Sequence, residues 1–214
     1  MRAVAEALLD IGAVKITPDQ PFSLASGRLS PVYIDDRLVM SHPEEREMIS
    51  KEFARRLRRN VGLVNFDSLV GAPTAGIHHA ANAASLLRLP LHILESVPED
   101  RTQFQLHTKL KPGERVVVIE DHVTSGGSVA DVVKFLRNRG AVADWCLSIT
   151  ALDRIKARKF FSSLGVQFQS LSELREILKV ARGRGLSERE YVEARKWMRD
   201  PTGWAEKFLA LQSA

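Results

Sequence analysis

The sequence contains little cysteine and no long apolar run. Cys146 is the only cysteine in 214 residues, which excludes an intramolecular disulfide and the disulfide-stapled class of small folds. No window approaches the roughly 20 consecutive apolar residues of a membrane-spanning helix. No apolar secretory segment follows Met1. These absences predict a cytoplasmic protein with no membrane partner.

Positively charged residues are only slightly in excess over negatively charged ones. The chain has 31 Lys and Arg against 26 Asp and Glu, a net charge of +5. With 44% hydrophobic and 27% charged residues, the composition is that of a globular chain and excludes collagen and coiled coils. Much of the basic excess lies on a predicted helix over 44–59 and near the C-terminus, so we predict no nucleic-acid partner.

From about residue 67, predicted strands alternate with predicted helices. The strands cover 68–70, 91–94, 115–119, 145–152 and 166–168, and helices cover 129–139, 156–164 and a stretch ending at Leu87. Such alternation indicates right-handed βαβ units and a mainly parallel sheet. The polar stretch 95–111 contains no predicted element. The chain from about 171 onwards is predicted to be helical, without a strand.

Residues 116–128 carry the strongest chemical signal. A buried apolar strand leads into Glu120 and Asp121, and a loop rich in glycine and hydroxyl groups then opens a helix. Ligands of parallel sheets bind at the carboxyl ends of strands. The loop N–H groups and the helix dipole favour a phosphate, whereas the carboxylates suit sugar hydroxyls or a metal-bound water. The pattern predicts a site for a ribose 5-phosphate.

Other candidate sites are weaker. The loop lacks the lysine of a P-loop and the Gly-x-Gly-x-x-Gly spacing of a dinucleotide site. His78 and His79 are adjacent on a predicted helix and point about 100° apart, a poor arrangement for two metal ligands. Cys146 lies in an apolar run and is interpreted as a core residue.

The segment 116–128 resembles the phosphoribosyl pyrophosphate (PRPP) motif of the type I phosphoribosyltransferases. Four further segments are similar to the orotate phosphoribosyltransferases within that family. They are the N-terminal hood pattern over 22–37, the pyrophosphate-side loop over 71–77, the pair Asp153-Arg154, and the C-terminal helix pattern over 194–201. The resemblance extends over nearly the whole chain.

This resemblance implies a single α/β domain of the type I phosphoribosyltransferase fold. A hood region (1–40) would precede the core of a mainly parallel sheet flanked by helices (41–170) and a helical C-terminal extension (171–214). The implied enzyme is a homodimer that converts orotate and PRPP to orotidine 5′-phosphate and pyrophosphate in pyrimidine biosynthesis. Its Mg²⁺ cofactor would be held by substrate oxygens rather than by protein side chains.

The resemblance also implies roles for individual residues. Glu120 and Asp121 would be the catalytic pair, on the ribose hydroxyls. Arg154 would meet the orotate carboxylate, which suits a guanidinium fork. The implied substrate-binding residues are Ser26, Tyr33, Thr74, Ala75, Arg101, Glu120, Asp121, His122, Val123, Thr124, Ser125, Gly126, Gly127, Ser128 and Arg154. His122 stands where the family usually has an aliphatic residue, and is either a neutral replacement or a contact to the base.

The chain departs from the family at the loop that supplies cations to pyrophosphate. Residues 94–107 are acidic there, and Arg101, His107 and Lys109 are the remaining local cations. Ala25 also stands where many members have lysine. Three hypotheses remain open: an orotate enzyme that uses another cation such as Arg28, Arg37 or Arg101, a transferase for another base, or a non-catalytic regulator that binds PRPP or nucleotides.

Overall fold

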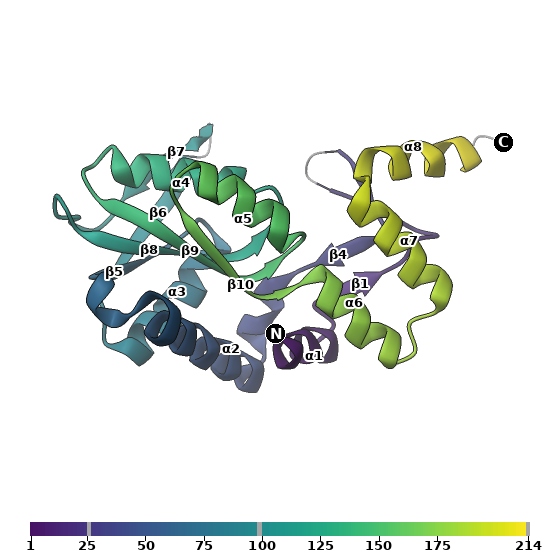
Figure 1. Ribbon diagram of the computed structural model, residues 1–214, viewed down its shortest axis with the longest axis horizontal. Helices are drawn as coiled ribbons and strands as arrows, with labels where there is room; N and C mark the ends of the chain where they lie inside the picture. The colour runs from purple at the N-terminus through teal and green to yellow at the C-terminus, as the bar shows by residue number, and fades with distance from the viewer. Residues whose placement is uncertain (25–26, 98–99, 213–214) are drawn as a thin grey trace.

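A six-stranded sheet forms the centre of the larger lobe (Figure 1). The computed structural model describes residues 1–24, 27–97 and 100–212. The strand order is β10-β9-β8-β5-β6-β7, and every pairing is parallel except that of β7 with β6. The strands are β5 (Ser68–Gly71), β6 (Leu91–Val97), β7 (Asp100–Leu106), β8 (Arg115–Val123), β9 (Val142–Ala151) and β10 (Gln167–Glu173). The predicted mainly parallel sheet is confirmed.

Helices cover both faces of this sheet. The first pair, α2 (Pro43–Arg56) and α3 (Ala75–Leu87), lies on one face, and α4 (Gly127–Arg137) and α5 (Arg154–Ser163) lie on the other (Figure 1). Val117 and Ile119 of β8 belong to the hydrophobic core on the face of α2 and α3. Val118 belongs to the hydrophobic core on the face of α4 and α5. The uninterrupted β-branched run of β8 is therefore explained, because this central strand is buried on both faces.

The two ends of the chain build the smaller lobe together. Its elements are α1 (Arg2–Asp10), β1 (Val14–Ile16), β2 (Phe22–Ser23), β3 (Leu29–Ser30), β4 (Val32–Ile34), α6 (Leu174–Gly183), α7 (Glu188–Arg199) and α8 (Pro201–Gln212). The Trp197 indole donates a hydrogen bond to the Leu29 carbonyl at 3.1 Å. Trp197 and Leu8 of this lobe belong to the same hydrophobic core cluster as Ile149 of β9.

Two sequence predictions need correction. Residues 95–111 are not featureless, because β6 continues to Val97 and β7 pairs with it as an antiparallel edge strand. The signal was the period-two spacing of Phe104 and Leu106, which direct apolar side chains towards the core beside α4. The last strand, β10, also runs to Glu173, past the predicted helical boundary at 171, because it pairs with β9 along its length.

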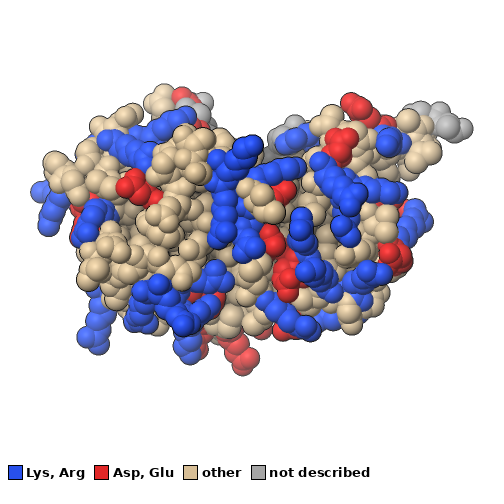
Figure 2. All heavy atoms as spheres, in the orientation of Figure 1, with Lys and Arg blue, Asp and Glu red and all other residues tan. Residues whose placement is uncertain are grey.

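The basic excess is distributed rather than concentrated on the face shown in Figure 2. Lys and Arg side chains lie over both lobes and are interspersed with acidic ones. On α2, Glu52 pairs with Arg55 at 2.6 Å and with Arg56 at 2.9 Å. These pairs within one helix agree with a solvated helix face. Among the described residues, no helix combines the length and apolarity needed to span a bilayer.

His79 of α3 is a buried imidazole without polar partners. Its exposure is 1%, and neither ring nitrogen has a hydrogen-bond partner among the described residues. The ring lies 6.4 Å from that of Phe53, measured between centroids. Burial lowers the pKa of His79 to about 4. The residue therefore packs as a neutral core side chain whose two nitrogens destabilise the fold.

Replacing His79 with leucine is expected to stabilise the protein. Removing an unpartnered buried polar group gains about 1–2 kcal/mol near neutral pH. Because the folded-state pKa of His79 is about 4 and its ordinary value is 6.5, the unfolded chain takes up a proton first as pH falls through that window, and wild-type stability declines. The free energy of unfolding, measured with urea, should fall between about pH 7 and about pH 5 in the wild type. In His79→Leu this fall should be smaller by about 2 kcal/mol. Equal declines would contradict this account.

Candidate active site

Two helix N-termini lie at the carboxyl ends of adjacent strands. The loop after β5 leads into α3 at Ala75, and the loop after the neighbouring strand β8 leads into α4 at Gly127. Thr74 and Thr124 are exposed on these two loops. Exposed N–H groups and the positive end of each helix dipole attract anions. This edge of the sheet therefore offers two neighbouring anion sites.

The backbone of the second loop depends on glycine. Gly126 has φ +90°, in the left-handed region that L side chains rarely adopt. A Cβ at this position would also lie 2.9 Å from ring atoms of Phe160 and Phe161. The turn leaves the side chains of Ser125 and Ser128 exposed, together with the backbone of Gly127, so they are available to a phosphate.

The first loop is held against β8 by a close backbone approach. A Cβ on Gly76 would lie 2.4 Å from the carbonyl oxygen of Ile119 and 3.1 Å from Cα of Glu120. Glycine therefore allows α3 to start directly beside the acidic pair. This contact brings the predicted pyrophosphate-side loop and the predicted ribose-binding residues to one place.

The two acids differ in environment. β8 continues through Val123, so both acids lie within the strand rather than after it. Glu120 is 6% exposed, and its Oε1 accepts a hydrogen bond from the backbone N–H of Asp121 at 2.9 Å. Burial, together with the neighbouring Asp121, raises the pKa of Glu120 well above its usual range. Asp121 is half-buried, which leaves its carboxylate as the one accessible to a ligand.

A buried polar chain runs from this strand to the hood region. His122 lies opposite Thr150 of β9, and Nδ1 of its ring is 2.7 Å from the Thr150 hydroxyl. That hydroxyl donates in turn to Oδ2 of Asp36, at the start of the 3₁₀ helix η1 (Asp36–Ser41). Sequence reasoning missed Asp36 and Thr150. The available signal was a hydroxyl residue within the apolar strand 145–152.

Arg154 lies at the same edge of the sheet. The backbone N–H of Leu152 donates to the Val123 carbonyl at 2.9 Å, so the ends of β8 and β9 are joined. Asp153 caps α5 by accepting from two backbone N–H groups, and Arg154 follows as the first helical residue. The Nε of Arg154 is 3.6 Å from an Oε of Glu173. Arg154, the predicted partner of orotate, therefore lies at this edge of the sheet and is paired with the carboxylate of Glu173.

Two residues of the hood region have partners within the chain. Tyr33 packs on Phe22 with ring centroids 5.3 Å apart. Arg37 donates to both carboxylate oxygens of Asp35, at 2.6 and 2.7 Å. Ser26 and the side chain of Arg101 lie outside the described residues, and their predicted roles stay predictions.

The acidic loop is an ordered hairpin in its described part. His107, the residue after β7, pairs with Glu95 of β6 at 3.0 Å. One of the local cations is thus already matched by an acid. Lys109 is exposed and lies just beyond the hairpin.

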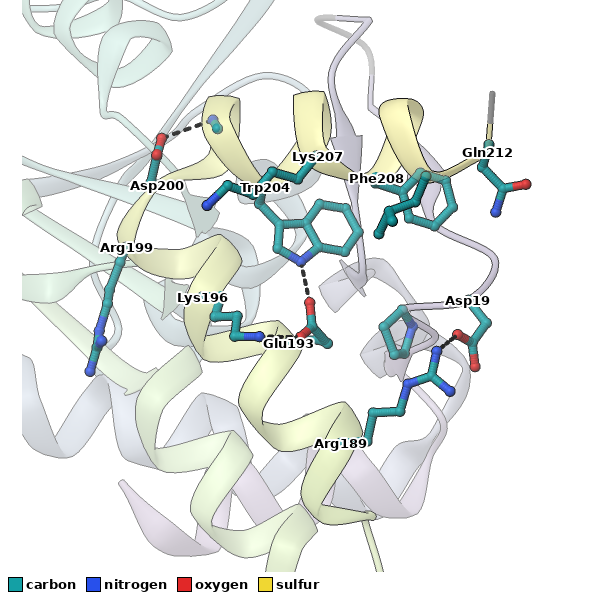
Figure 3. Close-up of a pocket in the computed structure, with 13 residues that line it drawn as sticks. Asp19, Arg189, Glu193, Lys196, Arg199, Asp200, Trp204, Lys207, Phe208 and Gln212 are labelled. Carbon is teal, nitrogen blue, oxygen red and sulfur yellow. Dashed lines mark hydrogen bonds and ion pairs between the residues drawn. The ribbon is translucent and has the colours of Figure 1, made fainter. Parts of the chain in front are cut away.

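A groove lies away from this edge, on the smaller lobe (Figure 3). It has a volume of about 710 Å³, with a wall formed by Trp204 and Phe208, whose rings stack at 5.5 Å. Glu193 accepts from the Trp204 indole at 2.8 Å and pairs with Lys196 at 2.7 Å. Glu193, Lys196 and the Trp204 indole therefore satisfy one another in this groove.

Comparisons with known proteins agree with this geometry. The family model described as the phosphoribosyl transferase domain matches residues 41–162. Orotate phosphoribosyltransferase of Streptococcus thermophilus is 37% identical, over 85% of this chain and 87% of its own length. The Cutibacterium acnes protein of the same name is 35% identical, over 96% of this chain and 95% of its own length.

Solved structures give the same result. The crystal structure of orotate phosphoribosyltransferase from Aeropyrum pernix superposes with a TM-score of 0.73 at 28% identity, covering 86% of this chain and 99% of that chain. The structure of Leishmania donovani UMP synthase, at 24% identity, shares the fold with a TM-score of 0.76. The match covers 92% of this chain and 42% of that chain. The chain belongs to the phosphoribosyltransferase family and, within it, to the orotate phosphoribosyltransferases.

Proposed function

We propose that this protein transfers the 5-phosphoribosyl group of PRPP to orotate, giving orotidine 5′-phosphate and pyrophosphate in pyrimidine biosynthesis. The single observation that carries the proposal is the pairing of two helix N-termini around Asp121. One N-terminus suits the 5-phosphate and the other the pyrophosphate of the same molecule, and the carboxylate between them suits the ribose hydroxyls.

The substrate-binding roles follow from position. The backbone and hydroxyl groups of residues 124–128 receive the 5-phosphate, and those of residues 71–77 face the pyrophosphate. Thr124 and Arg154 meet orotate, with Arg154 exchanging its contact to Glu173 for the orotate carboxylate. Catalysis then consists of positioning the base against C1′ and stabilising the charge that develops on the leaving group.

Mg²⁺ fits this site as an ion carried by the substrate. The described residues contain no group of three or more His, Cys, Asp or Glu that would hold a metal. Oxygens of the pyrophosphate and ribose are the hard ligands that Mg²⁺ prefers, with water completing its shell. When bound, the ion neutralises charge on the leaving pyrophosphate.

The second part of the proposal concerns which residue supplies further positive charge to the leaving pyrophosphate. Arg37 is engaged by Asp35, and His107 by Glu95, within one chain. We therefore propose a homodimer in which the hairpin of one protomer, with Arg101, reaches the site of its partner. Light scattering should give twice the mass of 23.9 kDa, and Arg101→Ala should lower kcat about tenfold or more.

Turnover is tested with purified protein, Mg²⁺, PRPP and orotate, by following orotate absorbance. A fall in absorbance that requires PRPP supports the proposal. If orotate is not consumed while another base is, the substrate assignment is wrong. If PRPP binds by calorimetry without turnover of any base, the protein is a PRPP-binding regulator.

A further inference from the structure

The chain from His122 through Thr150 to Asp36 has a defined hydrogen-bond direction. The Thr150 hydroxyl has one proton, and it donates that proton to Asp36. The 2.7 Å contact to His122 must therefore use the Nδ1–H of the imidazole as donor. The neutral ring consequently has its lone pair on Nε2.

Nε2 of His122 is the end of this chain that faces outwards. It has no hydrogen-bond partner among the described residues. Unlike the two ring nitrogens of His79, it is not among the fully buried atoms without a partner, and His122 as a residue is half-buried, beside Asp121 and two residues before Thr124. A hydrogen-bond acceptor thus lies on the same strand as Asp121, close in sequence to Thr124, which the proposed function assigns to orotate.

We propose that His122, Thr150 and Asp36 form a proton relay that accepts the proton displaced from the base during transfer. This inference rests on the proposed function, because it assigns the relay to the ring nitrogen that becomes bonded to C1′. In this role His122 is a catalytic residue that touches the base. Thr150 and Asp36 act through it.

The step balances without any further reactant. The electron pair of the base N–H bond forms the N–C1′ bond, and the C1′–O bond breaks with its pair leaving on pyrophosphate. The released proton goes to Nε2 of His122. The Nδ1 proton then moves to the Thr150 oxygen while the Thr150 hydroxyl proton moves to Oδ2 of Asp36. The relay starts from the state in which Asp36 is ionised and accepts from Thr150, and it ends with a neutral imidazole and a neutral carboxyl group.

The surroundings favour that end state. Burial raises the pKa of Asp36 well above its usual range, and the nearby charges of Asp121 and Asp35 act in the same direction. Burial lowers the pKa of His122, against the opposing effect of Asp121, so an imidazolium is disfavoured. Glu120 is a further acid near Asp36. Both shifts favour movement of the proton from the imidazole towards Asp36.

A purely structural role explains Asp36 poorly. The residue is 1% exposed, and its Oδ1 has no partner among the described residues. A buried carboxylate with one hydrogen bond destabilises a fold, because it loses more hydration than it regains. Such a group is typical of a functional site.

Two variants test the relay in the orotate assay. His122→Ala should lower kcat about 100-fold, with KM for PRPP within about twofold of wild type, and added imidazole should restore part of kcat. Thr150→Val retains the ring and removes the hydroxyl, and should lower kcat at least about tenfold. Both losses should diminish as pH rises, because a base that has already lost its proton needs no acceptor. An unchanged kcat, or a loss that neither imidazole nor high pH reduces, would overturn the relay.

A matched control and a second readout separate the relay from folding and from the proposed function. Ser172 lies opposite Thr150 on β10 with a buried hydroxyl that has no partner among the described residues, so Ser172→Ala should leave kcat unchanged. Nitrogen-15 NMR should find the Nδ1–H tautomer of His122 in the wild type and a shifted tautomer ratio in Thr150→Val. An Nε2–H tautomer in both would refute the relay whether or not orotate reacts. Absence of wild-type turnover would refute only the proposed function.

Discussion

Asp121→Asn is expected to lower kcat/KM for PRPP about 1000-fold. The carboxylate is the accessible one of the acidic pair, and two ribose hydroxyls donating to it contribute about 1.5–3 kcal/mol each. An asparagine amide accepts through a single oxygen and carries no charge, so most of this stabilisation is lost. Since each 1.4 kcal/mol corresponds to a factor of ten, steady-state kinetics with varied PRPP measures the loss directly.

Glu120→Gln is the matched control for that substitution. Burial and Asp121 raise the pKa of Glu120 well above its usual range, so the neutral form of Glu120 is favoured more than in an exposed glutamate and a neutral amide perturbs it less. The glutamine oxygen also retains the acceptor for the Asp121 N–H. We expect a loss no larger than about tenfold. Equal effects of the two substitutions would show that the acids share one role and would refute the assignment.

Gly76→Ala is expected to lower the free energy of unfolding by about 3 kcal/mol. The added methyl group would lie 2.4 Å from the Ile119 carbonyl oxygen, so α3 and β8 have to separate. Backbone atoms on both sides are fixed by the helix and by the central strand, and they yield less readily than side chains do. Urea unfolding monitored by circular dichroism measures the change, and PRPP binding should weaken because the pyrophosphate-side loop moves with α3.

Gly183→Ala serves as the control for a methyl group without a clash. Gly183 is the last residue of α6, and its added Cβ would meet no atom within 4 Å. Alanine has the higher helix propensity, so stability should stay equal or rise by up to about 1 kcal/mol. A similar loss in both variants would mean that the close approach at Gly76 does not hold α3 against the sheet.

The site was predictable from the sequence where its residues are contiguous. Residues 116–128 form one strand, loop and helix start, and the local preferences of β-branched residues, glycine and hydroxyl side chains determine that order. The hood pattern and Arg154 were found by resemblance rather than by physical reasoning. Their actual partners, Asp35 for Arg37 and Glu173 for Arg154, were not predicted, because each pairing depends on a side-chain conformation set by the packed neighbours.

The sequence by itself determined the alternating strands and helices of the sheet and the local chemistry of the loop at 124–128, but not the edge strand β7. Backbone sterics within a few residues set the side-chain period, which is two residues in strands and 3.6 in helices. The same local sterics favour glycine where φ is positive. Only the tertiary structure decided which distant residues meet: Asp36 with Thr150, 114 positions apart, and the N-terminal segment with the C-terminal helices. Such contacts arise from packing the whole chain around one core, and no local pattern specifies them.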